Sequence, residues 1–305
     1  MEHLYGVDVA KREIVVCGPS GLERVENAPG PLSAWVAGLP AGSELLLEPT
    51  GRHHRPLERL ALSSGIVVRR ADPCAVAAYR RALSPRAKTD PGDARLLRRM
   101  LLAEREGLRR ACEGDAAGQA LRDLVALRER LVAQRTALRQ AADGRGWLPP
   151  SLEGALEGLD AAIRELDEEA ARQARAFPLY GRLLGVDGVG PATAAALVSL
   201  LAGRDFRSAD AFVAYLGLDL RVCESGAFRG RRRLSKRGPG FARRLLFCAG
   251  AALSRMAAWR PLFERQAAKG LSRTEAVVVA ARKLARVAWA VAKGAEYDRR
   301  IALGA

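Results

Sequence analysis

The sequence predicts an α/β domain at the N-terminus followed by two mainly helical regions, and three observations support this. In the first third, short apolar segments alternate with amphipathic ones, which is typical of a mainly parallel sheet with covering helices. Two long amphipathic segments follow, separated by a proline-containing break. The last third has helical patterns almost throughout. We therefore expect three domains, at 1–112, 113–178 and 179–305.

Four segments of the first domain have strand character. Residues 3–10 and 12–18 are apolar and closely spaced, which favours an antiparallel hairpin. Residues 43–51 contain a continuous apolar run, typical of a strand buried on both faces. Residues 66–71 supply the fourth strand, so the hairpin is expected to add an antiparallel edge to a mainly parallel sheet.

Three helices are expected between and after these strands. The first spans 52–65 and ends at Gly65, because glycine adopts the left-handed conformation that often closes a helix. The other two span 73–83 and 90–106.

The middle region predicts an antiparallel helical hairpin or coiled-coil arm. Its helices are expected from about Gln119 to Asp143 and from about Leu152 to Phe177, with the proline-containing break between them. We expect one leucine stripe to pair the helices with each other and with another protomer. The stripe consists of Leu121, Leu124, Leu127, Leu131 and Leu138.

Two segments of the last region have distinct helical signatures. Residues 183–201 place Gly188 and Gly190 between apolar helical segments, which resembles a helix-hairpin-helix element whose amides hold a DNA phosphate. A plain tight turn is the other interpretation. Residues 272–294 are apolar nearly all round their middle, which predicts a buried helix.

The chain is strongly basic, with 50 Lys and Arg against 34 Asp and Glu and a net charge of +16. This excess favours a polyanionic partner, most often nucleic acid. Codon bias can explain Arg in place of Lys, but it does not explain an excess of base over acid.

The five cysteines are dispersed, and no CxxC pair exists. The sequence therefore supports neither a disulfide framework nor a zinc site. A basic-then-apolar leader and a bilayer-length apolar run are both absent, so we expect a cytoplasmic protein that does not contact a membrane.

Asp90 and Asp93 open the helix predicted at 90–106 and have two interpretations. Asp90 can cap that helix, with Pro91 at its first position. Alternatively, residues three apart share one helical face, so both carboxylates can reach one divalent cation. One of them can cap while the other binds.

Two further acids strengthen the metal interpretation. Asp8 lies inside the first strand, where a charge is costly unless it is paired or bound to a metal. Glu48 ends the third predicted strand, and ligands gather at the carboxyl ends of parallel strands. Four carboxylates, at Asp8, Glu48, Asp90 and Asp93, favour a hard cation such as Mg²⁺. His53 and His54 are expected to be surface residues at a helix start, where either can contact phosphate.

A dense basic block follows Ser225 and Gly226. We expect it to contact nucleic-acid phosphates, because so many cations would repel one another without a polyanion. A solvated loop is the simpler interpretation, just as Ser225 by itself is typical of a turn residue. The block consists of Arg229, Arg231, Arg232, Arg233, Lys236 and Arg237.

Taken together, these motifs resemble a known family nearly end to end. The acids in YGVDVAK, LLEPTG and KTDPGDARLL resemble the DEDD set of a RuvC-like, RNase H-like nuclease domain. The C-terminal sequences GL, ESG, LSKRGPGFARRLL and VAARKLARVAW resemble transposases of the insertion-sequence family one hundred and ten, relatives of the Piv-type DNA invertases.

The resemblance implies an RNase H-like domain, a coiled-coil arm and a C-terminal transposase domain. It implies that the four acids hold Mg²⁺ and that a serine, at the position of Ser225, attacks DNA to form a covalent phosphoserine. It further implies donor and target DNA as substrates, a structured bridge RNA as guide, and a homodimer or tetramer in which acids of one subunit meet the serine of another.

One departure and three alternatives accompany this interpretation. The family commonly has proline where this chain has Leu220, which affects the loop that presents Ser225. Ser235 is the rival nucleophile, although it matches the downstream SKRG element rather than the SG position. A RuvC-like nuclease or junction resolvase would need the acids but not the serine. A non-catalytic binding protein is disfavoured because all four acids are present.

Overall fold

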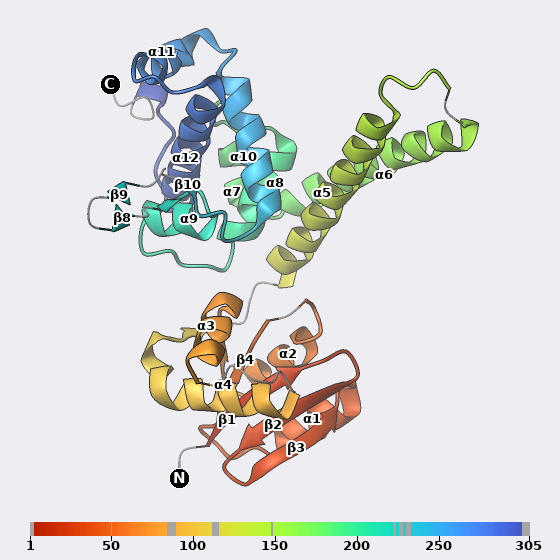
Figure 1. The fold of residues 1–305 in the computed structure, drawn as a ribbon, viewed down its shortest axis with the longest axis vertical. Helices are drawn as coiled ribbons and strands as arrows, with labels where there is room; N and C mark the ends of the chain where they lie inside the picture. The colour runs from red at the N-terminus through yellow and green to blue at the C-terminus, as the bar shows by residue number, and fades with distance from the viewer. Residues whose placement is uncertain are drawn as a thin grey trace. The chain divides into compact units, whose positions relative to one another are not determined.

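The computed structural model describes residues 3–49, 51–83, 90–111, 116–147, 149–221, 224–225, 228–229 and 233–300. The chain forms two compact units, Met1–Gly114 and Asp115–Ala305 (Figure 1). The first ends two residues after the boundary expected at 112, and its assignment as a catalytic domain stays a prediction. The second combines the predicted arm with the C-terminal helices, so a boundary near residue 178 stays a prediction.

The first unit contains a six-stranded mixed sheet with the order β3-β2-β1-β4-β5-β6. The predicted hairpin is confirmed by the antiparallel pairing of β1 with β2, and β1, β4 and β5 are parallel to one another. The strands are β1 (Leu4–Val9), β2 (Glu13–Gly18), β3 (Gly21–Glu26), β4 (Glu44–Leu47), β5 (Val67–Arg70) and β6 (Arg109–Arg110).

The expectation of a mainly parallel sheet is wrong, because sequence reasoning missed β3 and β6. Both pair antiparallel, β3 with β2 and β6 with β5. The sequence GLERVE of β3 has little apolar content, and five of its six residues are exposed at the sheet edge. Hydrogen bonding to β2, rather than burial, therefore defines this strand. The helix α1 (Pro29–Ala37) was also missed; among its residues, only Leu32 and Val36 are buried.

Helices cover both faces of this sheet. α1 and α2 (Arg55–Ser63) pack with the odd-numbered side chains of β1, including Val7, in one cluster. α4 (Asp90–Glu104) covers the other face with Leu4 and Leu46, whose cluster also includes Val76 of α3 (Pro73–Leu83). The prediction that β4 is buried on both faces is confirmed, since all four of its residues are buried.

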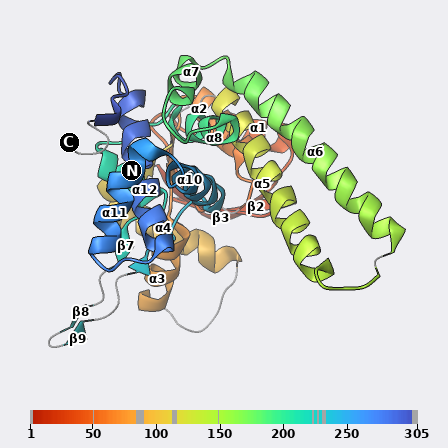
Figure 2. The ribbon, with the colours of Figure 1, turned by 90° about the horizontal axis from the view of Figure 1, so that it is seen from above.

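The middle helices α5 (Ala116–Ala142) and α6 (Pro150–Ala174) form an antiparallel pair, as predicted (Figure 2). Arg128 on α5 binds Asp167 on α6 at 2.9 Å, and Arg135 binds Asp160 at 2.6 Å. The residue numbers of the partners on α6 decrease as those on α5 increase, so the two helices run antiparallel.

The predicted leucine stripe on α5 is only partly correct. Leu121 is fully buried, but Leu127 is 48% exposed. The residues most deeply buried on this helix are Leu121, Val125, Glu129 and Val132, spaced three or four apart. Simple leucine counting failed here because the buried stripe includes valines and one charged residue. Pairing of this helix with another protomer stays a prediction.

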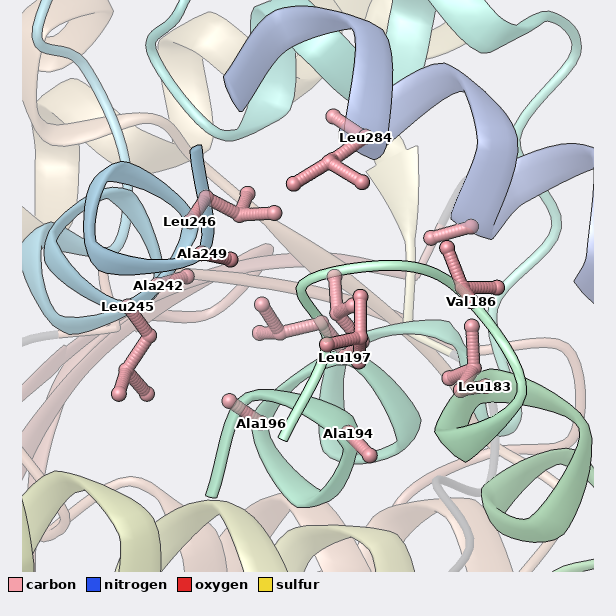
Figure 3. Packing of buried hydrophobic residues seen from close by; sticks show 14 of the residues in the cluster. Leu183, Val186, Ala194, Ala196, Leu197, Ala242, Leu245, Leu246, Ala249 and Leu284 are labelled. Atoms are coloured by element: carbon pink, nitrogen blue, oxygen red, sulfur yellow. The ribbon is translucent and has the colours of Figure 1, made fainter. Parts of the chain in front are cut away.

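The remaining helices form one apolar core (Figure 3). Leu183, Leu197, Leu246 and Leu284 come from four different helices and point into it. The helices are α7 (Pro178–Leu184), α8 (Pro191–Leu201), α9 (Ala209–Tyr215), α10 (Gly240–Leu253), α11 (Arg260–Ala268) and α12 (Arg273–Ala292).

The buried helix predicted at 272–294 is confirmed as α12. Ser272 and Glu275 form a capping box at its start, in which each side chain bonds to the other residue's backbone amide. Every residue from 276 to 292 is at least partly buried. Among the described helices, none is both long enough and apolar enough to cross a lipid bilayer.

Candidate active site

The carboxyl ends of β1 and β4 bring Asp8 and Glu48 near each other in the sheet. Val7 and Leu47 are partners in the parallel register, and Asp8 and Glu48 are the next residues along each chain segment. Asp8 pairs across the hairpin with Val15, which packs with Ala94 of α4. Because side chains alternate along a strand, Asp8 belongs to the face that α4 covers. Both carboxylates are half-buried.

The start of α4 lies at the same end of the sheet. Arg98 Nε donates to the carbonyl of Leu4 at 3.0 Å, and a Cβ added to Gly6 would lie 2.2 Å from the carbonyl oxygen of Ala94. The helix therefore runs antiparallel to β1 and against its backbone. Its first turn, which begins at Asp90, is directed toward the end of β1 that carries Asp8.

Asp93 lies on this first turn and makes an ion pair that sequence reasoning missed. Asp93 is 7% exposed, and its carboxylate lies 2.9 Å from Nη2 of Arg80 on α3. The side chain of Asp90 lies outside the described residues. In the sequence, Arg80 is only a basic residue on the helix before KTDPGDA, and nothing in that pattern indicates which acid it pairs with.

Among the described side chains, no three of the His, Cys, Asp and Glu type lie close enough to hold a metal ion together. Asp8, Glu48 and Asp93 supply only carboxylate oxygens, the donor type that suits a hard divalent cation. Convergence of all four acids on one ion therefore stays a prediction. Such an ion would compete with Arg80 for Asp93.

The two histidines after Glu48 differ in their environment. His53 is exposed, as predicted, but the expectation for His54 is wrong because it is only 7% exposed. His54 precedes α2, where burial lowers its pKa although the charge of Glu58 opposes this. A buried imidazole that stays neutral is unsuited to contact phosphate from the surface.

Ser225 lies in a short β-hairpin of the second unit. β7 (Leu220–Arg221) pairs antiparallel with β10 (Arg233–Leu234). In a separate two-stranded sheet, β8 (Glu224–Ser225) pairs antiparallel with β9 (Phe228–Arg229). Ser225 is thus the last residue of β8, and two residues separate it from β9. Leu220, at the family's usual proline position, is a strand residue of β7.

The basic block borders this hairpin. Arg233, Lys236 and Arg237 are exposed, which fits a nucleic-acid contact. Arg229 belongs to β9, while Arg231 and Arg232 lie outside the described residues. Ser235, the rival nucleophile, donates a hydrogen bond from its hydroxyl to Oδ1 of Asp219. Sequence reasoning missed Asp219, since an acid beside a GL dipeptide gives no pairing signal.

The glycine-rich turn between α7 and α8 has a packing role that sequence reasoning did not specify. Gly188 has φ +76°, and a Cβ there would lie 2.9 Å from the carbonyl oxygen of Ala249 on α10. Close approach of α10 therefore requires glycine at this position. Gly190 is exposed and directly precedes α8. Phosphate binding by this turn stays a prediction.

The mixed sheet, its covering helices and the acids at one end are consistent with the RNase H-like class of domain, here followed by a helical region. Residues 5–144 match a DEDD transposase model, and residues 180–266 match the model described as "Transposase IS116/IS110/IS902 family". The chain belongs to this family of transposases, which are enzymes.

A curated relative supports this membership. The chain is 36% identical over 152 residues to a "Probable family 20 transposase" of Pseudomonas aeruginosa. The match covers 48% of this chain and 45% of the relative, so the chain spans less than half of that protein's length.

Proposed function

We propose that this protein is a metal-dependent DNA transposase that cuts and rejoins DNA through a covalent phosphoserine at Ser225. The observation that carries this proposal is the position of Ser225 at the end of a β-hairpin bordered by exposed basic residues, in a chain of the transposase family. A hairpin end next to cations is a suitable place for a nucleophile that must approach a phosphate.

The proposed reaction has two balanced steps. The hydroxyl oxygen of Ser225 forms a bond to phosphorus, the bond from phosphorus to one sugar oxygen breaks, and the serine proton passes to solvent while the released sugar oxygen gains one. In the second step, a sugar hydroxyl of the other DNA attacks the phosphoserine and restores the free serine. No external energy source is needed, because each broken phosphoester is replaced by another.

The acids Asp8, Glu48, Asp90 and Asp93 are the proposed ligands of Mg²⁺. When bound, the ion would stabilise negative charge on the reacting phosphate. Asp8 and Glu48 lie at the ends of β1 and β4, and Asp90 and Asp93 belong to the first turn of α4. Because these acids and Ser225 belong to different units of the chain, the reaction requires the two units, or two subunits, to come together around DNA.

The basic block is the proposed DNA contact. Arg229, Arg231, Arg232, Arg233, Lys236 and Arg237 would bind phosphates regardless of base sequence. Gly188 and Gly190 would add amides from their turn. Family resemblance further suggests that a structured bridge RNA selects donor and target DNA, and that the active form is a homodimer or tetramer.

The alternative proposal is a hydrolytic RuvC-like nuclease or junction resolvase. It is favoured by the fact that the DEDD match, over residues 5–144, does not depend on Ser225. In that case water would replace the serine as nucleophile.

One experiment separates these proposals. Protein is incubated with donor DNA, target DNA, Mg²⁺ and RNA transcribed from the sequence flanking the gene, then denatured and examined for protein that stays attached to DNA. We expect an adduct with the native protein and with Ser235→Ala, but none with Ser225→Ala. An adduct that persists in Ser225→Ala would contradict the proposed nucleophile, and cleavage by the native protein without any adduct would favour the hydrolytic nuclease.

A further inference from the structure

The chain segments on either side of the Ser225 hairpin are joined by a continuous backbone ladder. Beyond the pairing of β7 with β10, the amide of Ser235 donates to the carbonyl of Asp219 at 2.9 Å. The amide of Lys236 then donates to the carbonyl of Gly217 at 3.1 Å. Residues 217–221 and 233–236, which flank the chain segment that carries Ser225, therefore form a paired base.

This base is locked against the end of α9 by two glycines. A Cβ on Gly217 would lie 2.4 Å from the carbonyl oxygen of Arg237, and a Cβ on Gly238 would lie 2.0 Å from that of Tyr215. Both glycines have positive φ, +68° and +118°. Arg243 of α10 donates hydrogen bonds to the carbonyls of Leu216 and Gly238, each at 3.0 Å. Such close packing leaves the base little freedom to shift.

One side-chain hydrogen bond also spans the base, from the Ser235 hydroxyl to Asp219. Asp219 thus ties the SKRG segment to the residues directly before β7.

We propose that Asp219 and Ser235 are positioning residues, whose hydrogen bond fixes the base of the hairpin that presents Ser225. This inference rests on the proposed phosphoserine mechanism. Attack on phosphorus requires the nucleophile in line with the bond that breaks, and a misplacement of about 1 Å can cost about a hundredfold in rate. Ser235 is itself engaged by a carboxylate, so its hydroxyl serves the geometry of the hairpin rather than the reaction.

The test compares native protein with Ser235→Ala, Ser235→Thr and Asp219→Asn in the full-length chain, supplied with DNA, Mg²⁺ and RNA as above. Ser254→Ala is the matched control, because Ser254 directly follows α10 and its hydroxyl donates a local hydrogen bond of 2.8 Å to the carbonyl of Ala251. The rate of adduct formation is measured in a single turnover, DNA affinity is measured separately, and hydrogen exchange is followed at the amides of 217–221 and 233–236.

We expect Ser235→Ala to form the adduct on Ser225 about tenfold or more slowly, at unchanged DNA affinity and with faster amide exchange in the base. Ser235→Thr, which keeps the hydroxyl, should stay within about threefold of the native rate, since the hydrogen bond is retained. Asp219→Asn should keep an intermediate rate, because its amide oxygen still accepts a hydrogen bond. The Ser254→Ala control should match the native protein in all three measurements.

Equal adduct rates in the native protein and Ser235→Ala, or unchanged amide exchange, would overturn the positioning role alone. An adduct found on Ser235 itself would replace that role with a nucleophilic one. Absence of an adduct in the native protein would instead overturn the proposed function and the positioning role together. These failures are distinguishable, because only the last one removes the adduct from every variant.

Discussion

At the scale of single residues, the carboxylates of the first unit differ in burial and in their place in the sheet. Glu44 is buried and paired with two arginines, Arg69 and Arg105, at 2.8 and 2.6 Å. Its charge is satisfied by protein alone, which is typical of a structural role. Asp8 and Glu48 lie at the strand ends and are half-buried, and we propose that they bind a cation.

Substitution of Asp8 or Asp93 by alanine is expected to abolish strand transfer while DNA binding is retained. Loss of a carboxylate removes a proposed metal ligand, and the reaction should slow by at least about a hundredfold. Adduct formation and DNA affinity are measured side by side. Glu106→Ala is the control, because Glu106 is an exposed acid of the same unit outside the proposed site. Full activity in Asp8→Ala would exclude this residue as a ligand.

Glu44 provides a prediction for stability and its dependence on pH. Burial raises the pKa of Glu44, but hydrogen bonds from Arg105 and Arg69 and their charges outweigh it and hold the pKa below the usual 4.5. The stabilisation from this carboxylate is therefore present above about pH 4.5 and is lost as the pH falls through its lowered pKa.

Accordingly, Glu44→Ala should lower the free energy of unfolding at pH 7 by about 3 kcal/mol, because it leaves Arg69 buried and unpaired. The difference from the native protein should shrink when the pH is taken well below 4.5. Urea unfolding at the two pH values measures both effects. A difference that stays constant with pH would show that the carboxylate charge contributes nothing.

At the scale of elements, one side of α5 is buried in the helical core and another side is exposed. Its buried stripe joins the helical core, and Glu129 within that stripe binds Arg244 of α10 through two hydrogen bonds. Arg128 also donates to Glu129, at 2.6 Å. The buried charge is therefore paired on two sides. Leu127 lies outside this stripe and is exposed.

The same substitution at two positions of α5 tests this division. Leu121→Ala should lower the free energy of unfolding by about 2–5 kcal/mol, because it creates a cavity in the core. Leu127→Ala should cost less than about 0.5 kcal/mol in the monomer, as is usual at the surface. Chemical unfolding measures both variants. If Leu127 joins an interface between protomers, sedimentation should show that Leu127→Ala shifts the oligomer toward smaller species, and equal stability losses at both positions would contradict the division.

At the scale of the whole molecule, the attraction of DNA by the net charge of +16 has to be distinguished from DNA binding at a local site. A uniformly cationic chain attracts DNA without any specific site. The exposed residues of the basic block, by contrast, are concentrated around the hairpin that carries Ser225.

Removal of three charges from the block, by Arg233→Gln, Lys236→Asn and Arg237→Gln together, should weaken DNA binding equally for all base sequences. Asparagine is chosen at position 236 because Lys236 has φ +54°, which asparagine tolerates well. The logarithmic salt slope should flatten by about 0.9 for each DNA phosphate that the variant no longer neutralises. Binding is measured over a range of salt concentrations.

A matched variant removes three exposed arginines from the arm and its C-terminal end, Arg145, Arg164 and Arg175. An equal loss in both variants would mean that net charge alone governs binding. A loss of base selectivity with an unchanged salt slope would mean that the block reads bases.

The sequence alone determined the class of the first domain, its hairpin and central strands, the long helices α5, α6 and α12, and membership of the transposase family. These features depend on local periodicity and on motifs whose residue types carry the chemistry. Tertiary structure decided the rest. β3 and β6 form through pairing with neighbours, Leu127 is exposed because α5 turns its valines inward, and His54 is buried by its surroundings. The ion pair of Arg80 with Asp93 and the hydrogen bond of Ser235 with Asp219 join residues 13 and 16 positions apart, because such contacts depend on how elements pack and leave no local pattern in the chain.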